Sequence, residues 1–356
     1  MTATTNTREF LLCHFKTYPQ LRIEDIFKFL YQSAFGCEHL LPEPEAAAEF
    51  IRKEAAGMAE HSGALIEALD GPYCRVSLDY VRQGLAPDTL AKLLFLSAVH
   101  EPTGKAALAE KLQCAKDLVF DGALPFTPQE FLDAVTQWEA RGCPPLHHSE
   151  TFRQNYHPAY RLIGAQYVPF LPVLATLDRK LEKGPVVFAI EGGSASGKTT
   201  LSQLMEKLYD CTVFHMDDFF LRPEQRTPQR FAEPGGNIDR ERFLEEVLLP
   251  MAQNQEVAYR RFDCSTFSLL PTETVVPKKL TIIEGAYCMH PDLSGHYDLS
   301  LFMETAPEVQ AKRIHKRNTP EMAQRFFAQW IPMEHRYFDA FHVKERCDYN
   351  IFIENQ

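Results

Sequence analysis

The strongest chemical signal in the sequence is GGSASGKTT, at positions 192–200. An apolar stretch, PVVFAIEG, leads into it and a helical pattern, TTLSQLMEKLY, follows, which is the strand-loop-helix setting of a phosphate-binding loop. At average composition, a chain of this length would match the loop pattern by accident on the order of once in a hundred. The pattern is G-x-x-x-x-G-K-[ST], and its defining positions are Gly192, Gly197, Lys198 and Thr199.

Such a loop binds a nucleoside triphosphate together with Mg²⁺. Its glycines let consecutive backbone N–H groups surround a phosphate, and the N-terminus of the next helix adds a partial positive charge. Lys198 is expected to reach the β- and γ-phosphates, and the Thr199 hydroxyl to be a ligand of Mg²⁺. The alternative is a glycine-rich turn that only caps a helix. The residues predicted to bind ATP are Gly192, Gly193, Ser194, Ala195, Ser196, Gly197, Lys198, Thr199 and Thr200.

Three carboxylates follow predicted strands. CTVFHMDDFF, the first strand-like segment after the helix of the loop, leads to Asp217 and Asp218, and LTIIEGAY carries a later strand to Glu284. Because parallel strands of such a sheet end at one edge, we expect these side chains beside the magnesium nucleotide, which indicates kinase chemistry. We expect the two aspartates on extended chain, with side chains on opposite sides, so that one alone can act as a base. The alternative is that both only cap a helix.

The elements that must position these residues change in character once along the chain. From about residue 20 to 182, apolar residues recur at three- and four-residue spacing, which predicts helices. From Gly184 onward, short β-rich runs alternate with helical patterns, which predicts a parallel sheet with helices on both faces. The predicted fold is therefore an α/β P-loop NTPase-type domain over residues 184–356, preceded by an all-α domain over residues 1–183. The join is placed at LEKGP, residues 181–185.

The composition limits the classes of function. The 356 residues are 45% hydrophobic and 24% charged, and the net charge of −11 disfavours binding to the nucleic-acid backbone. No window reaches the roughly 18 apolar residues of a membrane span, and the N-terminal segment has no basic region followed by a long apolar stretch, so we expect no secretion signal. Nine cysteines are scattered without a CxxC pair, which is typical of reduced thiols. We expect a cytoplasmic protein with a small-molecule substrate and with no nucleic-acid or membrane partner; homo-oligomerisation stays open.

Five motifs in order resemble the uridine kinase and phosphoribulokinase family of P-loop kinases. The resemblance covers roughly residues 184–356 and includes the final segments PMEHRYFDAF and CDYNIFI. It implies an ATP- and Mg²⁺-dependent kinase that transfers the γ-phosphate to a hydroxyl of a small metabolite, with a nucleoside such as uridine as the leading acceptor. The five motifs are GGSASGKTT, HMDDFF, NIDRERF, LTIIEGAY and YDLSLFMETAPEVQAKRIHKRN.

The resemblance also implies roles for single residues. Asp217 would be the general base for the acceptor hydroxyl, and Asp239 falls on the aspartate that holds the ribose. Glu284 falls on the glutamate near the metal, and Asp218 is a further candidate ligand of Mg²⁺. Arg313 and Arg317 fall on the lid arginines that contact the triphosphate. Their four-residue spacing independently predicts one helix face, although a solvated surface helix shows the same spacing.

The acceptor site departs from the family pattern. Phe220 stands where the family has a tyrosine, and VAYRRFDCSTFSL, residues 257–269, lacks the histidine that reads a pyrimidine. Tyr259, Arg261 and Asp263 could bind a different acceptor, or they could form a hairpin with TETVVP. Other acceptors, namely pantothenate, another riboside or a polyol, therefore stay open, as does a regulatory ATP-binding module without turnover. The candidate substrate-binding residues are Asp239, Phe220, Tyr259 and Arg261.

The first half of the chain contains two polar clusters without a recognised function. One is FGCEHLL, with Glu38 and His39, and the other begins HHSETFRQNYH. In the second cluster, His147, His148 and Glu150 could be metal ligands, or the cluster could be the start of a helix capped by Ser149. The second interpretation is favoured because further ligands at coordinating spacing are missing from the cluster.

Overall fold

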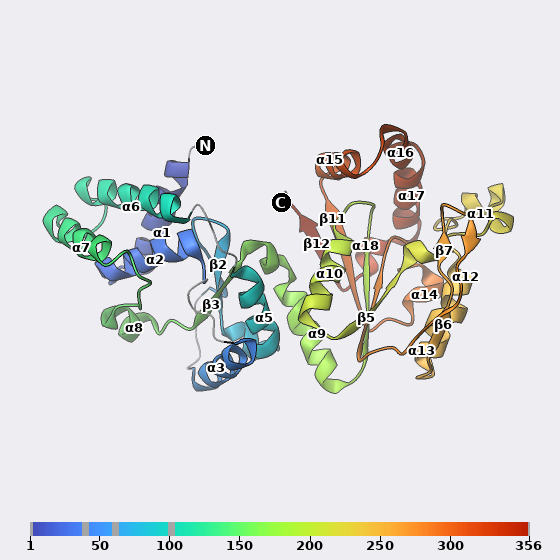
Figure 1. The fold of residues 1–356 in the computed structure, drawn as a ribbon, viewed down its shortest axis with the longest axis horizontal. Helices are drawn as coiled ribbons and strands as arrows, with labels where there is room; N and C mark the ends of the chain where they lie inside the picture. Colours follow the sequence, from blue (N-terminus) through green and yellow to red (C-terminus); the bar gives the residue numbers. More distant parts are fainter. Residues whose placement is uncertain (1–2, 38–42, 59–63, 99–103, 355–356) are drawn as a thin grey trace. The chain divides into compact units, whose positions relative to one another are not determined.

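The structure, a computed structural model, describes residues 3–37, 43–58, 64–98 and 104–354. The chain forms two compact units, Met1–Leu171 and Pro172–Gln356 (Figure 1). Glu38 and His39 lie outside the described residues. No helix among the described residues combines the length and apolar character needed to cross a bilayer.

The first unit consists mainly of helices. The α2 helix shows why: its buried Ile23, Ile26, Phe27 and Leu30 repeat at three- and four-residue spacing and pack into the hydrophobic core. The elements are α1 (Ala3–Thr17), α2 (Ile23–Phe35), α3 (Pro44–Gly57), β1 (Ile66–Ala68), β2 (Tyr73–Ser77), α4 (Asp79–Arg82), α5 (Pro87–Ser97), α6 (Gly104–Phe120), α7 (Pro128–Ala140), α8 (Glu150–Tyr156), β3 (Tyr160–Gly164) and the 3₁₀ helix η2 (Ala165–Phe170).

The expectation of a wholly helical first unit is wrong in one respect. Strands β1, β2 and β3 form a three-stranded antiparallel sheet, with β2 in the centre. The central strand has no alternating pattern because all five of its side chains are buried, including Arg75. Arg75 donates to Gln32 Oε1 from two nitrogens at 2.7 and 2.9 Å and to Glu67 Oε2 at 3.1 Å. A charged residue inside a short strand hides the strand from a search for apolar runs.

The histidine cluster of this unit forms a helix start, as favoured from the sequence. Ser149 Oγ accepts the Phe152 N–H at 3.0 Å and caps α8. His148 is buried, with Nδ1 3.1 Å from Asp25 Oδ1 and Nε2 2.6 Å from the Tyr160 hydroxyl, so both ring nitrogens have partners. Within the described ranges, no group of three or more His, Cys, Asp or Glu side chains has an arrangement that could hold a metal ion.

The second unit alternates strands and helices, as predicted. Its elements as far as β9 are α9 (Leu171–Lys183), β4 (Val186–Gly192), α10 (Lys198–Leu208), β5 (Cys211–His215), η3 (Met216–Phe219), η4 (Pro223–Gln225), α11 (Pro228–Ala232), α12 (Arg240–Phe243), η5 (Leu244–Leu248), α13 (Leu249–Ala252), β6 (Val257–Tyr259), β7 (Phe262–Asp263), β8 (Ser268–Leu269) and β9 (Glu273–Val275). They continue with β10 (Leu280–Glu284), α14 (Pro291–Ser294), β11 (Leu299–Thr305), α15 (Pro307–Arg317), α16 (Pro320–Arg325), η6 (Phe326–Trp330), α17 (Ile331–Phe341), α18 (Val343–Arg346) and β12 (Tyr349–Ile353).

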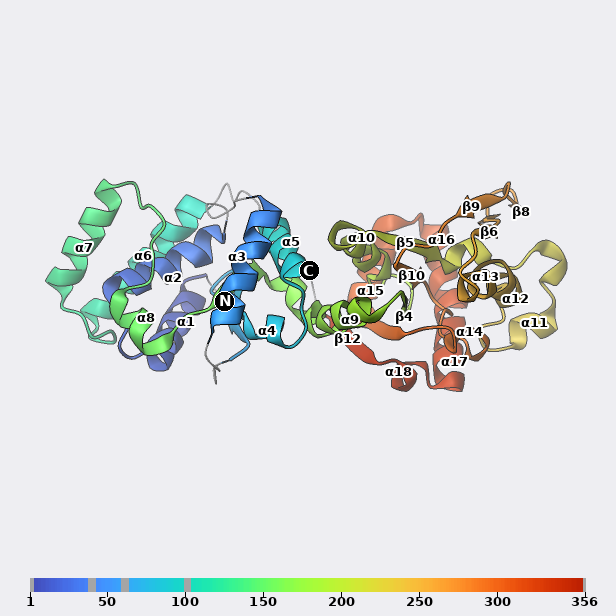
Figure 2. The same ribbon diagram turned by 90° about the horizontal axis from the view of Figure 1, so that it is seen from below.

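A five-stranded parallel sheet in the order β12-β11-β4-β10-β5 forms the centre of this unit (Figure 2). Helix α10 packs on one face, against β4, β5 and β10. On the other face, Ala189, Phe214 and Ile283 of three neighbouring strands share a core with Val247 of η5 and Tyr337 of α17. The predicted parallel sheet with helices on both faces is confirmed.

The compact units meet between residues 171 and 172, whereas the sequence places the join at residues 181–185. The difference is helix α9, which makes contacts within the second unit. The Thr176 hydroxyl lies 2.7 Å from the Tyr349 hydroxyl, and the Tyr209 hydroxyl donates to Asp178 at 2.9 Å. Thr176 and Asp178 thus attach α9 to β12 and to the end of α10. Gly184, which follows α9, therefore does not mark the edge of a unit.

The buried His148 makes the stability of the first unit dependent on pH. Burial lowers its pKa from 6.5 to about 4, against the hydrogen bond with Asp25. Below pH 6.5 the unfolded chain therefore binds a proton that the folded unit does not, and the free energy of unfolding should fall by about 2 kcal/mol between pH 7 and pH 5. In a Trp330→Phe background, urea unfolding followed by the fluorescence of buried Trp138 measures this unit alone.

His148→Gln should remove this part of the pH dependence, while His147→Gln, a substitution of the exposed neighbour, should keep it. Burial also lowers the pKa of His14, which adds the same slope to both variants. An unchanged pH dependence in His148→Gln would contradict the assignment to His148.

Candidate active site

The phosphate loop connects β4 to α10, as the sequence predicts. Gly192 ends the strand and Gly197 precedes the helix, both with positive φ, at 149° and 109°. A Cβ at Gly192 would lie 2.3 Å from the carbonyl oxygen of Met303 on β11, so this position requires glycine. Close packing against the neighbouring strand thus fixes where the loop begins. Ser196 Oγ is buried and has no hydrogen-bond partner among the described residues, so the loop holds one free polar group.

Lys198 is the positive centre of the site. It is 9% exposed, and its Nζ donates to the carbonyl oxygen of Gly193 at 3.0 Å. Its charge acts on nearby carboxylates: burial raises the pKa of Asp217 and of Glu334, and attraction to Lys198 opposes both increases. The ammonium of the loop therefore lies within electrostatic reach of acidic side chains from η3 and α17.

Glu284, at the end of β10, connects this strand to the phosphate loop. Thr199 Oγ1 donates to Glu284 Oε1 at 3.0 Å, and His215 Nδ1 lies 2.7 Å from Glu284 Oε2. The parallel register pairs Glu284 with His215 on one side and with Ile190 on the other, so β10 and β5 end together at the loop. Burial acts to raise the pKa of Glu284, but the His215 hydrogen bond and Lys198 outweigh it and lower the pKa.

Asp217 and Asp218 follow β5 at the same edge, as expected from the sequence. The expectation of extended chain is wrong, because both residues lie in the 3₁₀ turn η3, which folds the chain back over the end of the strand. Asp217 is exposed, and its charged neighbours are Lys198, Glu284 and His215. Asp218 has a different environment: burial raises its pKa, and His215 and Arg261 oppose the increase. The turn therefore separates the two side chains, with Asp217 on the side of the loop.

Oxygen groups suited to Mg²⁺ meet at the end of β10. Thr199 and Glu284 supply a hydroxyl and a carboxylate that lie within hydrogen-bond distance of each other. The negative charge of Glu284 also repels that of Asp217 and, together with burial, raises the pKa of Asp217. A bound cation would relieve this repulsion. This donor set fits Mg²⁺, whose remaining ligands are usually phosphate oxygens and water. For Asp218, the other predicted ligand, the charges of His215 and Arg261 oppose the increase in pKa that burial causes.

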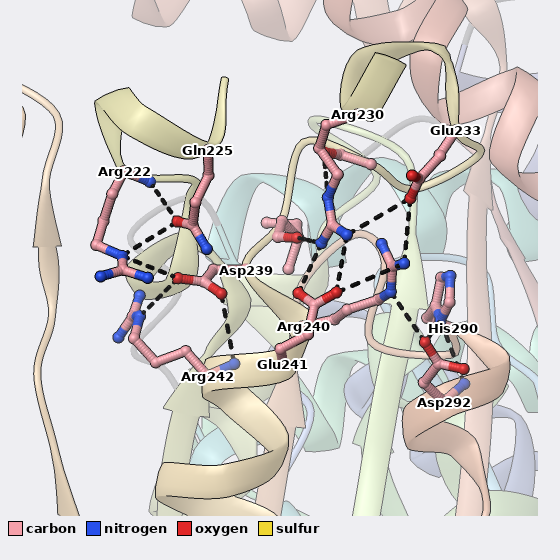
Figure 3. A network of polar contacts seen from close by, with 12 residues as sticks. Arg222, Gln225, Arg230, Glu233, Asp239, Arg240, Glu241, Arg242, His290 and Asp292 are labelled. Atoms are coloured by element: carbon pink, nitrogen blue, oxygen red, sulfur yellow. Dashed lines mark hydrogen bonds and ion pairs between the residues drawn. The ribbon is translucent and has the colours of Figure 1, made fainter. Parts of the chain in front are cut away.

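Asp239 lies next to this turn because the chain segments around Phe220 and Ile238 form a β-bridge. Its carboxylate is 1% exposed and caps α12 through the backbone N–H of Arg242 at 3.4 Å. Arg242 Nε also donates to Asp239 Oδ2 at 3.2 Å, and Arg222 approaches the same oxygen at 3.6 Å (Figure 3). The structure thus gives the predicted ribose-holding residue an ion-pairing and capping role within the unit.

The other candidate acceptor residues lie in a hairpin. Strand β6, which contains Tyr259, pairs with β9, and Arg261 Nε donates to Glu273 of that strand at 2.8 Å. Tyr259 is buried, and its ring stacks on Phe219 at 5.9 Å between centroids. Of the two alternatives left open by the sequence, the structure contains the hairpin with TETVVP.

Helix α15 contributes to the loop from the other side. Arg313 donates to the carbonyl oxygen of Ala195 at 3.0 Å, and Gln310 donates to that of Ser194 at 2.8 Å. Burial and the like charge of Arg317 lower the pKa of Arg313, which indicates that the two guanidinium groups are close to each other. One lid arginine therefore contacts the loop directly, and Arg317, which is exposed, lies one turn farther along the helix.

Two residues of the site were not singled out from the sequence. His215 lies within the HMDDFF segment, and its place at the end of a strand just before Asp217 was the available signal. Glu334 accepts hydrogen bonds from Ser194 of the loop, but it belongs to α17, far away in the sequence. It lies in the segment PMEHRYFDAF, which carries part of the family resemblance, but only the packing of α17 on the sheet brings it to the loop.

Comparison with known proteins finds sequences similar to the second unit. Residues 187–325 match the model of the Phosphoribulokinase / Uridine kinase family. A uridine kinase of Chloroflexus aurantiacus is 27% identical, with 38% of this chain and 69% of that protein covered. Uridine kinase-like protein 4 of Arabidopsis thaliana is 29% identical, with 40% of this chain and 32% of that protein covered. A solved structure of a possible uridine kinase from Bacillus stearothermophilus has 21% identity and a TM-score of 0.38, with 49% of this chain and 96% of that chain covered.

The family match falls on the phosphate loop, on the turn with Asp217 and on the strand that ends at Glu284. The resemblance predicted from five sequence motifs is thereby confirmed for this part of the chain. Residues 187–325 of the second unit thus match the Phosphoribulokinase / Uridine kinase family.

Proposed function

We propose that the protein is an ATP-dependent kinase that phosphorylates a hydroxyl of a small metabolite, with a nucleoside as the leading acceptor. One observation carries the proposal: the loop lysine, a hydroxyl–carboxylate pair and a separate solvent-accessible carboxylate share one sheet edge. A protein that only binds ATP does not require a base such as the Asp217 carboxylate. Relatives named uridine kinase support the nucleoside, while the missing histidine in residues 257–269 leaves room for other small acceptors.

In the proposed reaction, Asp217 takes the proton of the acceptor hydroxyl. The oxygen forms a bond to the γ-phosphorus, the bond from that phosphorus to the bridging oxygen of ATP breaks, and ADP leaves. Desolvation by the surrounding protein raises the pKa of Asp217, which makes its carboxylate a stronger base than one in water. Thr199 and Glu284 would hold Mg²⁺, which supplies positive charge to the phosphate oxygens.

The guanidinium groups of α15 complete this proposal. Arg313 contacts the loop backbone at Ala195, so its guanidinium group would lie beside a phosphate bound in the loop. Arg317 adds a second positive charge nearby. Positive charge in this position stabilises the transferring phosphoryl group, whose charge spreads over its oxygens in the transition state.

The acceptor can be identified by a turnover screen. ADP release from MgATP should be measured against nucleosides, pantothenate, other ribosides and sugar alcohols, with an acceptor-free control for background hydrolysis. A nucleoside should give the largest rate above background. Turnover with pantothenate or a polyol alone would replace the nucleoside in the proposal, and nucleotide binding without turnover on any acceptor would favour the regulatory module.

Asp217→Asn should lower kcat by about 10²- to 10⁴-fold, the usual range for loss of a general base. The affinity for ATP should change little, because the loop and Lys198 supply most of that binding. Asp218→Asn is the matched control: it changes the same charge one residue later, on the side of Arg261, and should have a much smaller effect on kcat. Steady-state kinetics and nucleotide titration of both variants test this; the reverse order of effects would transfer the role of base to Asp218.

Asp239→Ala should destabilise the second unit. The substitution removes the cap of α12 and one of the two carboxylate partners of the buried Arg242, which keeps Glu246 at 3.5 Å, and we expect a cost of about 1 to 3 kcal/mol. Urea unfolding followed by circular dichroism measures the effect, with the exposed Glu245→Ala as the control. If Asp239 also holds the acceptor, the acceptor KM will rise far more than the KM for ATP. Unchanged stability would show that the ion pair with Arg242 has little energetic weight.

A further inference from the structure

A carboxylate from α17 occupies the phosphate loop. Glu334 Oε2 accepts the backbone N–H of Ser194 at 2.9 Å, and Glu334 Oε1 accepts the hydroxyl of the same residue at 2.5 Å. Glu334 is 4% exposed, so this is a buried contact in the interior of the site. Backbone N–H groups of such a loop are the donors that bind phosphate oxygens, and a carboxylate is an anion of similar hydrogen-bonding capacity.

The ammonium of Lys198 is also used internally. Lys198 Nζ donates to the Gly193 carbonyl at 3.0 Å, so the lysine is turned toward the loop backbone. Burial raises the pKa of Glu334, and its hydrogen bonds with Ser194 and the charge of Lys198 oppose the increase. The Ser194 donors and the charge of Lys198, which would bind a phosphate, thus already stabilise the buried carboxylate of Glu334. A phosphate placed at Ser194 would lose that N–H donor to Glu334 and would be repelled by its carboxylate.

Contacts other than the one between Glu334 and Ser194 anchor the helix and the loop. Tyr337 lies one turn later on the same face of α17, and its hydroxyl donates to the fully buried Glu191 at 3.0 Å, which attaches the helix to the end of β4. Gln310 and Arg313 hold the carbonyl groups of the loop from α15. The loop and the helix both keep their anchors when the contact between Glu334 and Ser194 breaks.

We propose that Glu334 is part of the nucleotide site as an internal competitor of phosphate, whose carboxylate must leave Ser194 before the phosphates of ATP can take its N–H. The identity of the ligand as ATP rests on the proposed function. Displacement of Glu334 costs part of the binding energy of ATP, so the residue lowers the affinity for phosphate-bearing ligands. When no nucleotide is bound, Glu334 accepts hydrogen bonds from the N–H and the hydroxyl of Ser194 and so links α17 to the loop.

Glu334→Gln tests the proposal because it removes the charge and keeps the shape. The amide oxygen can still accept the Ser194 N–H, and the amide nitrogen can donate to Ser194 Oγ. Charge-assisted hydrogen bonds of this kind are worth enough that MgATP and tripolyphosphate should bind about 10- to 100-fold more tightly to the variant. The affinity for adenosine, which has no phosphate, should stay the same. Glu345→Gln, an exposed glutamate on α18, is the matched control and should match the wild type for all three ligands.

Calorimetric titration of the full chain separates the outcomes, and circular dichroism verifies the fold of each variant. Equal or weaker binding of MgATP and tripolyphosphate to Glu334→Gln would overturn the inference and leave the proposed kinase function intact. Failure of the wild type and the variant alike to bind ATP would overturn both. Glu334→Ala provides a second variant if the glutamine variant is unstable, and tighter phosphate binding is expected there as well.

Discussion

The site depends on the electrostatic attraction between Lys198 and the carboxylates around it. The electrostatic field of Lys198 reaches Glu191, Asp217, Glu284 and Glu334, all of which experience an increase in pKa from burial that this lysine counteracts. Several carboxylates around one ammonium carry an excess of negative charge, which is stable only if hydrogen bonds or a bound cation compensate for it. In this structure backbone N–H groups, hydroxyls and His215 provide the hydrogen bonds.

The parallel sheet brings these groups together because its register sets where each strand ends. Glu284 pairs with His215 and Ile190, so residues from three strands reach one edge at the same height. The turn after β5 then places Asp217 toward the loop, and the bridge between Phe220 and Ile238 continues the arrangement to Asp239. The strand register, the turn and the β-bridge are all backbone interactions, so the backbone of the sheet determines where the side chains of the site lie.

The parts of this arrangement that could be predicted were those encoded locally. The glycine spacing of the loop and the strand that ends at Glu284 are each written in fewer than ten consecutive residues, and the family match confirms that they belong together. Predictions failed where a local pattern had more than one outcome. Strand β2 was missed because buried Arg75 interrupts its apolar run, and the two aspartates were expected on extended chain although η3 is a turn.

The sequence by itself determined the phosphate loop, the order of strands along the chain and the acidic residues that follow them, because all of these depend on short-range spacing and backbone conformation. Only the tertiary structure decided which distant groups complete the site. Glu334 reaches Ser194 through the packing of α17, and Arg242 donates a hydrogen bond to the carboxylate of Asp239. The physical reason is that a buried charge must find a partner, and the chain that folds around it determines which partner is close enough.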